Sequence, residues 1–133
     1  MNDLQRWELA DYRMKKATAT FSEVALLVEN ELWNTAVNRL YYACFYAVSA
    51  LLIFHNIPSK THSGTRQLFG LHFIKTGIVE KETGKFFSYL FDQRQTGDYD
   101  DFYDFEKEDV SGLIEPTKTL LFTIEKLIIL EQN

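Results

Sequence analysis

Three short stretches of the chain combine side chains that could bind or cleave a phosphate ester. In the first, Asn38 to Ala47, Arg39 is followed by Tyr42 and Tyr46. On a helix these three side chains would lie close together, so the guanidinium group could clamp a phosphate while the rings stack on a base. The same spacing also fits an arginine paired with a carboxylate of a neighbouring helix, with the tyrosines as half-buried packing.

The second stretch is the connector Lys60-Thr61-His62-Ser63-Gly64. Backbone N–H groups and a hydroxyl at a helix N-terminus, together with a lysine and an imidazole, would form a cradle for an anion, with Arg66 following on the same helix. The stretch lacks the glycine spacing of a phosphate-binding loop. The alternative is a helix cap formed by Thr61 or Ser63, with Lys60 in solvent.

The third stretch contains Arg94, Asp98 and Tyr99. If the helix persists, the four-residue spacing places Asp98 beneath Arg94, where its carboxylate would hold the guanidinium group ready for a phosphodiester. The alternative is an ordinary ion pair at a helix end, which contributes less than about 1 kcal/mol when exposed.

Other common chemistries lack their sequence signatures. The chain has no HExxH or CxxC motif and no histidine pair at metal-ligand spacing, so neither a metal site nor a cofactor is predicted. No serine has the context of a nucleophile elbow. The acidic segment from Asp98 to Asp109 lacks the alternating ligands and the glycine of an EF-hand, and is expected to be a solvated loop.

Composition indicates one domain spanning residues 1–133. Hydrophobic residues make up 46% of the chain, enough for a core without metals or disulfides. The single cysteine, Cys44, lies in an apolar run and is expected to be a small core side chain in a reduced, cytoplasmic protein. The uncharged run from Leu40 to Asn56 is shorter than the roughly 18–20 residues that span a bilayer, so no membrane contact is predicted.

The charge is unevenly distributed. The net charge of −5 argues against a sequence-independent nucleic-acid binder, which is normally basic. However, no acidic residue lies between His55 and Val79, where Lys60, Arg66, Lys75 and all three histidines are found. A locally basic edge on an acidic protein is therefore expected.

Helical periodicity runs through most of the chain, and no stretch shows the sustained alternation of a strand. Apolar residues recur every three or four positions between Trp7 and Val28, which predicts one amphipathic helix. The segment from Trp33 to Phe54 carries two such stripes and is expected to be the buried centre of the fold. The pattern predicts an all-α, up-and-down bundle of four to five helices.

Turn-forming residues set the expected helix boundaries. Asn30 or Asn34 is expected to provide the cap that separates the first two helices, and Pro58 to end the second. Gly77 suits the left-handed position after a short third helix.

The later boundaries depend on one glycine and one proline. Gly97 is expected to interrupt a fourth helix that runs from about residue 79 to 95. Pro116 lies inside the last helical pattern, so either that helix is kinked or a turn precedes a helix that has proline in its first turn.

Taken in order, the three stretches resemble the HEPN family of small helical prokaryotic domains. The likeness rests on the pattern from Arg39 to Phe45, on the loop from Lys60 to Gly64 with the phenylalanine-rich helix after it, and on Arg94 with Asp98 and Tyr99. It covers about residues 32–101. The resemblance implies an all-α homodimer, often encoded with a minimal nucleotidyltransferase partner, in toxin–antitoxin or defence systems.

The resemblance also bears on catalysis. Catalytic members of the family are metal-independent ribonucleases that use an arginine followed, after four to six residues, by a histidine. The corresponding positions here hold Tyr99, Asp100 and Asp101. A carboxylate cannot supply the proton transfer of an imidazole near neutral pH, so His62 would have to enter the site from the connector.

These observations leave three functions open. The leading hypothesis is a dimeric HEPN module that binds RNA or nucleotide through the residues of the three stretches. The second is a metal-independent endoribonuclease in which Arg94 holds the scissile phosphate. The third is a domain that binds a protein partner through its tyrosine-rich face. The residues expected at the site are Arg94, Asp98, Tyr99 and His62 as catalytic groups, and Arg39, Tyr42, Tyr46, Lys60, Thr61, Ser63 and Arg66 as ligand-binding groups.

Overall fold

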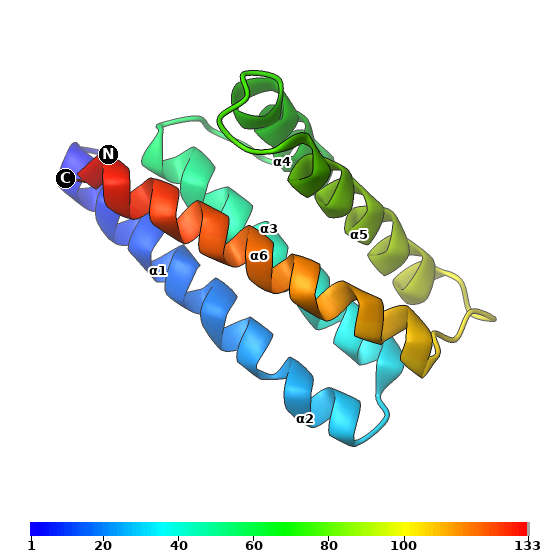
Figure 1. The fold of residues 1–133 in the computed structure, drawn as a ribbon. Helices are drawn as coiled ribbons and strands as arrows, with labels where there is room; N and C mark the ends of the chain where they lie inside the picture. Colours follow the sequence, from blue (N-terminus) through cyan, green and yellow to red (C-terminus); the bar gives the residue numbers. More distant parts are fainter. Residues whose placement is uncertain (133) are drawn as a thin grey trace.

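Helix α3 (Trp33–Phe54) lies at the centre of the molecule and contacts every other long helix (Figure 1). The computed structural model describes residues 1–132. Helices α1 (Asp3–Ser22) and α6 (Lys107–Gln132) pack on one side of α3, and α5 (Lys81–Tyr99) packs on the other. The long helices run alternately up and down, and residues 1–132 contain no strand. The predicted all-α bundle is confirmed.

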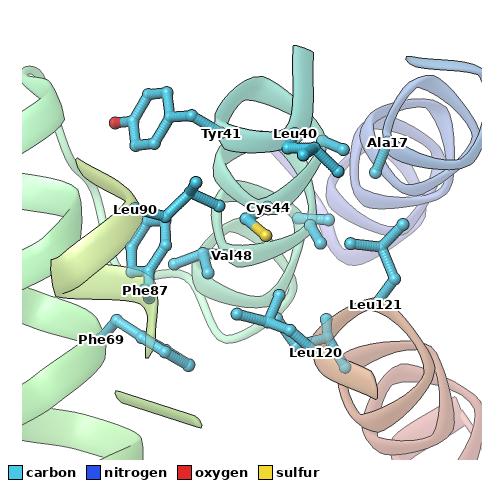
Figure 2. Packing of buried hydrophobic residues seen from close by; sticks show 14 of the residues in the cluster. Ala17, Leu40, Tyr41, Cys44, Val48, Phe69, Phe87, Leu90, Leu120 and Leu121 are labelled. Atoms are coloured by element: carbon cyan, nitrogen blue, oxygen red, sulfur yellow. The ribbon is translucent and has the colours of Figure 1, made fainter. Parts of the chain in front are cut away.

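The burial of α3 follows from its two apolar stripes. Leu40, Leu51 and Cys44 are inaccessible to solvent, as are the alanines at seven-residue spacing. In Figure 2, leucines of α6 pack on one side of this helix, and aromatic side chains of α4 and α5 pack on the opposite side. By length and mean hydropathy (1.4) α3 could cross a membrane, but 61% of its apolar window is buried in the protein, as expected for a core helix.

The prediction of one continuous helix between Trp7 and Val28 is wrong. The segment divides at Glu23 into α1 and a short helix, α2 (Val24–Glu29). At the break, the Ser22 hydroxyl donates a hydrogen bond to the carbonyl of Ala19 (2.6 Å), and the Glu23 N–H bonds to Thr20 (3.1 Å). A serine that bonds the preceding turn competes with the helical hydrogen-bond pattern, which accounts for the interruption.

The connector after Pro58 leads into α4 (His62–Phe69), which continues as a single π-helical segment, η1 (Gly70–Ile74). Thr61 is the N-cap of α4, and its hydroxyl accepts a hydrogen bond from the Gly64 N–H (2.9 Å). Gly77 has a φ of 81°. The predicted cap at Thr61 and the left-handed glycine after this helix are both confirmed.

Gly97 does not interrupt α5, which continues to Tyr99. The glycine instead makes room for a neighbouring side chain, because a Cβ at this position would lie 2.5 Å from Cε2 of Phe105. A glycine inside a helix costs only about 1 kcal/mol relative to alanine, which packing of a buried phenylalanine can offset. The predicted end near residue 95 is therefore wrong.

Two further boundary predictions need correction. Asn34 does not cap α3; its amide bonds the loop before α6 through the Tyr103 carbonyl (3.1 Å) and the Phe105 N–H (2.8 Å). Pro116 lies inside an unbroken α6, so a helix that starts at this proline is wrong. The carbonyl left without a helical donor is that of Gly112, which is exposed and can bond water. Asn30, by contrast, lies at the C-terminus of α2 and bonds the Leu26 carbonyl (2.8 Å).

Candidate functional site

Three segments that are distant in the sequence meet around the ring of Tyr41. The guanidinium carbon of Arg94, on α5, lies 4.8 Å from the centre of this ring. His62, the first residue of α4, places its Nδ1 atom 2.9 Å from the Tyr41 hydroxyl. Asp98 lies one turn after Arg94 and reaches α3 through Asn38. We call this group the Arg94 cluster; it contains Asn38, Arg39, Tyr41, Tyr42, His62, Arg94 and Asp98.

Arg94 is a buried cation with incomplete pairing. Its side chain is 6% exposed, and Nη1 lies 3.5 Å from Oδ2 of Asp98. The guanidinium group packs against the rings of Tyr41 and Tyr42, which attract cations through their π faces. Its buried Nε has no hydrogen-bond partner. Buried donors without a partner are rare and costly. The position of this arginine is therefore not explained by its own hydrogen bonds.

Asn38 connects two arginines through one carboxylate. Its Nδ2 donates to Asp98 (3.1 Å to Oδ2), and its Oδ1 accepts from Nε (3.1 Å) and Nη2 (2.8 Å) of Arg39. The Arg39 guanidinium also lies over the ring of Tyr42, 5.1 Å from its centre. No carboxylate lies within ion-pairing distance of Arg39 among the side chains of residues 1–129. The alternative of a simple ion pair between helices therefore does not describe Arg39.

Tyr41 is fully buried, and its environment fixes its protonation. Its ring stacks on Phe87 with the planes 4° apart. Burial is the main cause that raises the pKa of Tyr41 to about 12, so the hydroxyl keeps its proton at neutral pH. Figure 2 shows this hydroxyl directed away from the α1 and α6 side of the core. Because neighbouring Arg94 can only donate, the Tyr41 proton goes to His62.

His62 is consequently assigned as a neutral imidazole with Nδ1 as acceptor and the proton on Nε2. Burial, and next the charge of Arg94, lower the pKa of His62 below its usual value of 6.5. The ring stacks on Phe45 with centres 4.2 Å apart. A neutral imidazole held beside a guanidinium group is able to exchange a proton near physiological pH.

Of the remaining predicted residues, some adjoin the Arg94 cluster and others line separate pockets. Tyr46 lies against Tyr42 (5.8 Å between ring centres) and extends the aromatic surface, with Lys16 above its ring (4.8 Å). Lys60 and Thr61 line a pocket that shares only His62 with the cluster.

Three predicted residues lie away from the cluster. Ser63 and Arg66 face another hollow along α4, where Arg66 pairs with Asp92 (3.6 Å) and packs on Phe91. Tyr99 is 76% exposed and makes no hydrogen bond or ring contact with the cluster. Successive helical residues are rotated by about 100°, so the position after Asp98 points away from Arg94. The structure therefore does not bring Tyr99 to the Arg94 cluster, and its catalytic role stays a prediction.

Sequence reasoning missed Asn38 and Tyr41. An asparagine in the middle of an apolar helix was a usable signal, because Asn is unfavourable there unless its side chain has a partner. In the sequence Tyr41 counts as one of the apolar residues of the central helix, although a buried tyrosine hydroxyl usually finds a hydrogen-bond partner. Among the side chains of residues 1–129, no three from His, Cys, Asp or Glu gather as metal ligands.

Comparison with known proteins decides the family. The family model described as HEPN domain matches residues 10–127. The chain belongs to the HEPN family. The predicted resemblance is thereby confirmed, and the match extends beyond residues 32–101 into the first and last helices.

Similar proteins occur in Thermotoga maritima and Methanocaldococcus jannaschii. A UPF0332 protein of Thermotoga maritima is 41% identical over 128 residues, covering 96% of each chain. "Putative toxin MJ0142" of Methanocaldococcus jannaschii is 33% identical over 125 residues, covering 90% of this chain and 85% of its own. A second protein of that organism with a toxin name, MJ0605, is 36% identical over 83 residues, 62% of each chain. The chain therefore aligns with the first two of these HEPN relatives over most of their length.

Proposed function

We propose that this HEPN protein is a toxin-type module that binds the phosphate of RNA or of a nucleotide at the Arg94 cluster. The observation that carries the proposal is that the cluster holds two arginines and one carboxylate. Asp98 lies within ion-pairing distance of Arg94 and is linked to Arg39 only through the Asn38 amide. With His62 neutral, two positive charges face one negative charge. The cluster thus has an excess positive charge that an anionic ligand would neutralise.

Arg39 is the group best suited to meet the ligand. It is partly exposed, whereas Arg94 is buried. Its Nε and Nη2 both donate to one atom, the amide oxygen of Asn38. A phosphate presents two oxygens to the same pair of donors and carries a charge, so it is a stronger partner for this guanidinium group. Tyr42 and Tyr46 would provide aromatic surface for a base.

The cellular setting follows from the family and the relatives. Two of the relatives carry the word toxin in their names. We propose that this chain acts in a toxin–antitoxin or defence system as a cytoplasmic homodimer, with a minimal nucleotidyltransferase as partner protein. Size-exclusion chromatography of the chain mixed with a co-encoded nucleotidyltransferase tests the partner.

Binding to labelled single-stranded RNA, measured by fluorescence anisotropy in the presence of a chelator, tests the ligand. Arg39→Gln is expected to weaken binding at least tenfold, because it removes one charge and a bidentate donor. Lys118→Gln, an exposed charge change on α6, is the matched control and should change affinity less than twofold. Absence of binding by the wild-type protein to both RNA and nucleotides would overturn the proposal and favour a protein-interaction domain.

Metal-independent RNA cleavage is a second candidate, and the position of His62 favours it. The family pattern places a histidine after the arginine, and here the connector brings an imidazole to the same tyrosine that Arg94 contacts. Incubation of RNA with the protein in chelator would then give discrete products, lost in both His62→Gln and Arg94→Lys. Binding without cleavage would leave the non-catalytic module as the function.

A further inference from the structure

A pocket adjoins His62 and includes no other residue of the Arg94 cluster. It has a volume of about 390 Å³ and lies between α1, α3 and the connector before α4. Arg13 enters it from α1, Lys60 from the connector and His62 from the first turn of α4. We call it the Arg13 pocket. The Arg94 cluster does not include Arg13, and the sequence pattern did not single it out.

Every charged or titratable side chain that lines this pocket is a base. Arg13 donates a hydrogen bond to Ser49 (3.4 Å) and, like Lys60, has no carboxylate within ion-pairing distance among the side chains of residues 1–129. No acidic residue is part of the lining. Two unpaired cations in a concave site on an acidic protein create a local positive potential.

The hydrogen-bonding groups of the pocket are mostly donors as well. Because Nδ1 of His62 accepts from Tyr41, the imidazole presents its Nε2–H as a donor. The Thr61 hydroxyl is occupied as the cap of α4. Because Thr61 and His62 line the pocket, the positive end of the helix dipole lies beside it. Cations and N–H donors together select an anion.

We infer that the Arg13 pocket binds the terminal phosphate of a nucleotide, with Arg13, Lys60 and His62 as its ligands. A phosphomonoester carries a charge of about −1.5 to −2 at neutral pH and so balances Arg13 and Lys60. A phosphodiester or a carboxylate carries about −1 and would leave one cation unpaired. The inference deepens the proposed function and rests on it for the class of ligand.

The remaining lining explains why a nucleotide fits better than a free phosphate. Phe45, Ile53 and Ile57 provide apolar surface beside the cations. Small-molecule pockets usually have volumes of about 300–1,000 Å³, so this pocket has room for one nucleotide and not for folded RNA. The nucleotide is either free in solution or the end residue of an RNA strand, since both present the same phosphomonoester.

Isothermal titration calorimetry with 5′-AMP as the probe tests the pocket. Wild-type protein is expected to bind 5′-AMP at least tenfold more tightly than adenosine. The double variant Arg13→Gln and Lys60→Gln should lose at least tenfold of that affinity, whereas Lys118→Gln should change it less than twofold. Arg13→Lys, which keeps the charge, should retain most of it and shows that a loss is not caused by misfolding.

The same variants separate this inference from the proposed function. Arg39→Gln should weaken RNA binding more than it weakens 5′-AMP binding. The pocket variant should weaken 5′-AMP binding more than Arg39→Gln does. 5′-phosphorylated RNA is compared with 5′-hydroxyl RNA. If the phosphorylated RNA binds at least fivefold more tightly, and only while Arg13 and Lys60 are present, the phosphate that the pocket binds belongs to an RNA end. Binding of 5′-AMP that is unchanged in the pocket variant would overturn the inference while the proposed function stands.

Discussion

Tyr41 links the structural and chemical parts of this protein at the scale of a single residue. Its ring belongs to the core, where it is inaccessible to solvent and stacks on Phe87. Its π face supports Arg94, and its hydroxyl orients His62. Packing of the bundle therefore fixes the positions of the arginine and the imidazole, and any change at Tyr41 should affect both stability and the site.

Tyr41 predicts a specific dependence of stability on pH. Its pKa is about 12 in the folded protein and about 10 in an unfolded chain, so the folded state holds the proton more tightly. The stabilisation is fully present below pH ~10 and is lost as the pH rises toward 12, by about 2–3 kcal/mol in total. The Tyr41→Phe protein has no hydroxyl to titrate at this position, so its stability lacks this pH dependence. Because it also lacks the hydrogen bond to His62, it should be about 1 kcal/mol less stable than the wild type at neutral pH.

Urea unfolding of both proteins, followed from neutral to alkaline pH, checks this expectation. Other tyrosines and the lysines titrate equally in the two proteins, so the difference between their free energies of unfolding isolates Tyr41. The wild-type advantage should shrink and then reverse as the pH rises. Parallel curves would mean that the Tyr41 hydroxyl is not buried as described.

At the scale of the element, α5 owes its length to a contact with the segment that follows it. The ring of Phe105 occupies the space beside Gly97, and α5 runs on for another half turn to Tyr99. That extension brings Asp98 to Arg94 and Asn38. The glycine therefore supports the cluster through packing.

Alanine substitutions at two helical glycines should have opposite effects. In Gly97→Ala the new Cβ would lie 2.5 Å from Phe105, a buried ring with little room to shift. Overpacking of about 1–3 kcal/mol should exceed the helical gain of about 1 kcal/mol, so the protein becomes less stable. Gly112→Ala, in the exposed part of α6 with no atom within 4 Å of the new Cβ, should stabilise by about 0.5–1 kcal/mol. Thermal unfolding measures both, and a stabilised Gly97→Ala protein would contradict the packing role.

Sequence patterns predicted the features that depend on local residues and missed those that depend on tertiary contacts. The bounds of α3 were predictable because its apolar stripes repeat over many turns. The continuation through Gly97 was not, since it depends on Phe105. The cluster was anticipated only in part: residue types pointed to Arg39, His62 and Arg94, but nothing local shows that a histidine after α3 reaches a tyrosine inside it.

At the scale of the whole molecule, the cluster lies next to a surface that a monomer leaves exposed. The segment that follows Asp98 carries Tyr99, Phe102 and Tyr103, and Phe102 is 97% exposed. Burial of one phenylalanine side chain contributes about 1.5–3 kcal/mol, which makes such a segment a good candidate for contact with a second copy. The aspartates around it would meet the basic edge between residues 55 and 79 of that copy.

We therefore expect a dimer whose interface includes Phe102. Light scattering coupled to size-exclusion chromatography at micromolar concentration should give about twice the chain mass of 15.6 kDa. Phe102→Ser should shift the protein toward the monomer because it removes apolar area from the interface, and high salt should act in the same direction because it screens the charge contacts. Phe122→Ser, at a phenylalanine that is 62% exposed on α6, is the matched control and should remain dimeric. A monomeric wild-type protein would contradict the dimer, and a dimer that survives Phe102→Ser but dissociates in Phe122→Ser would place the interface on α6, away from the Arg94 cluster.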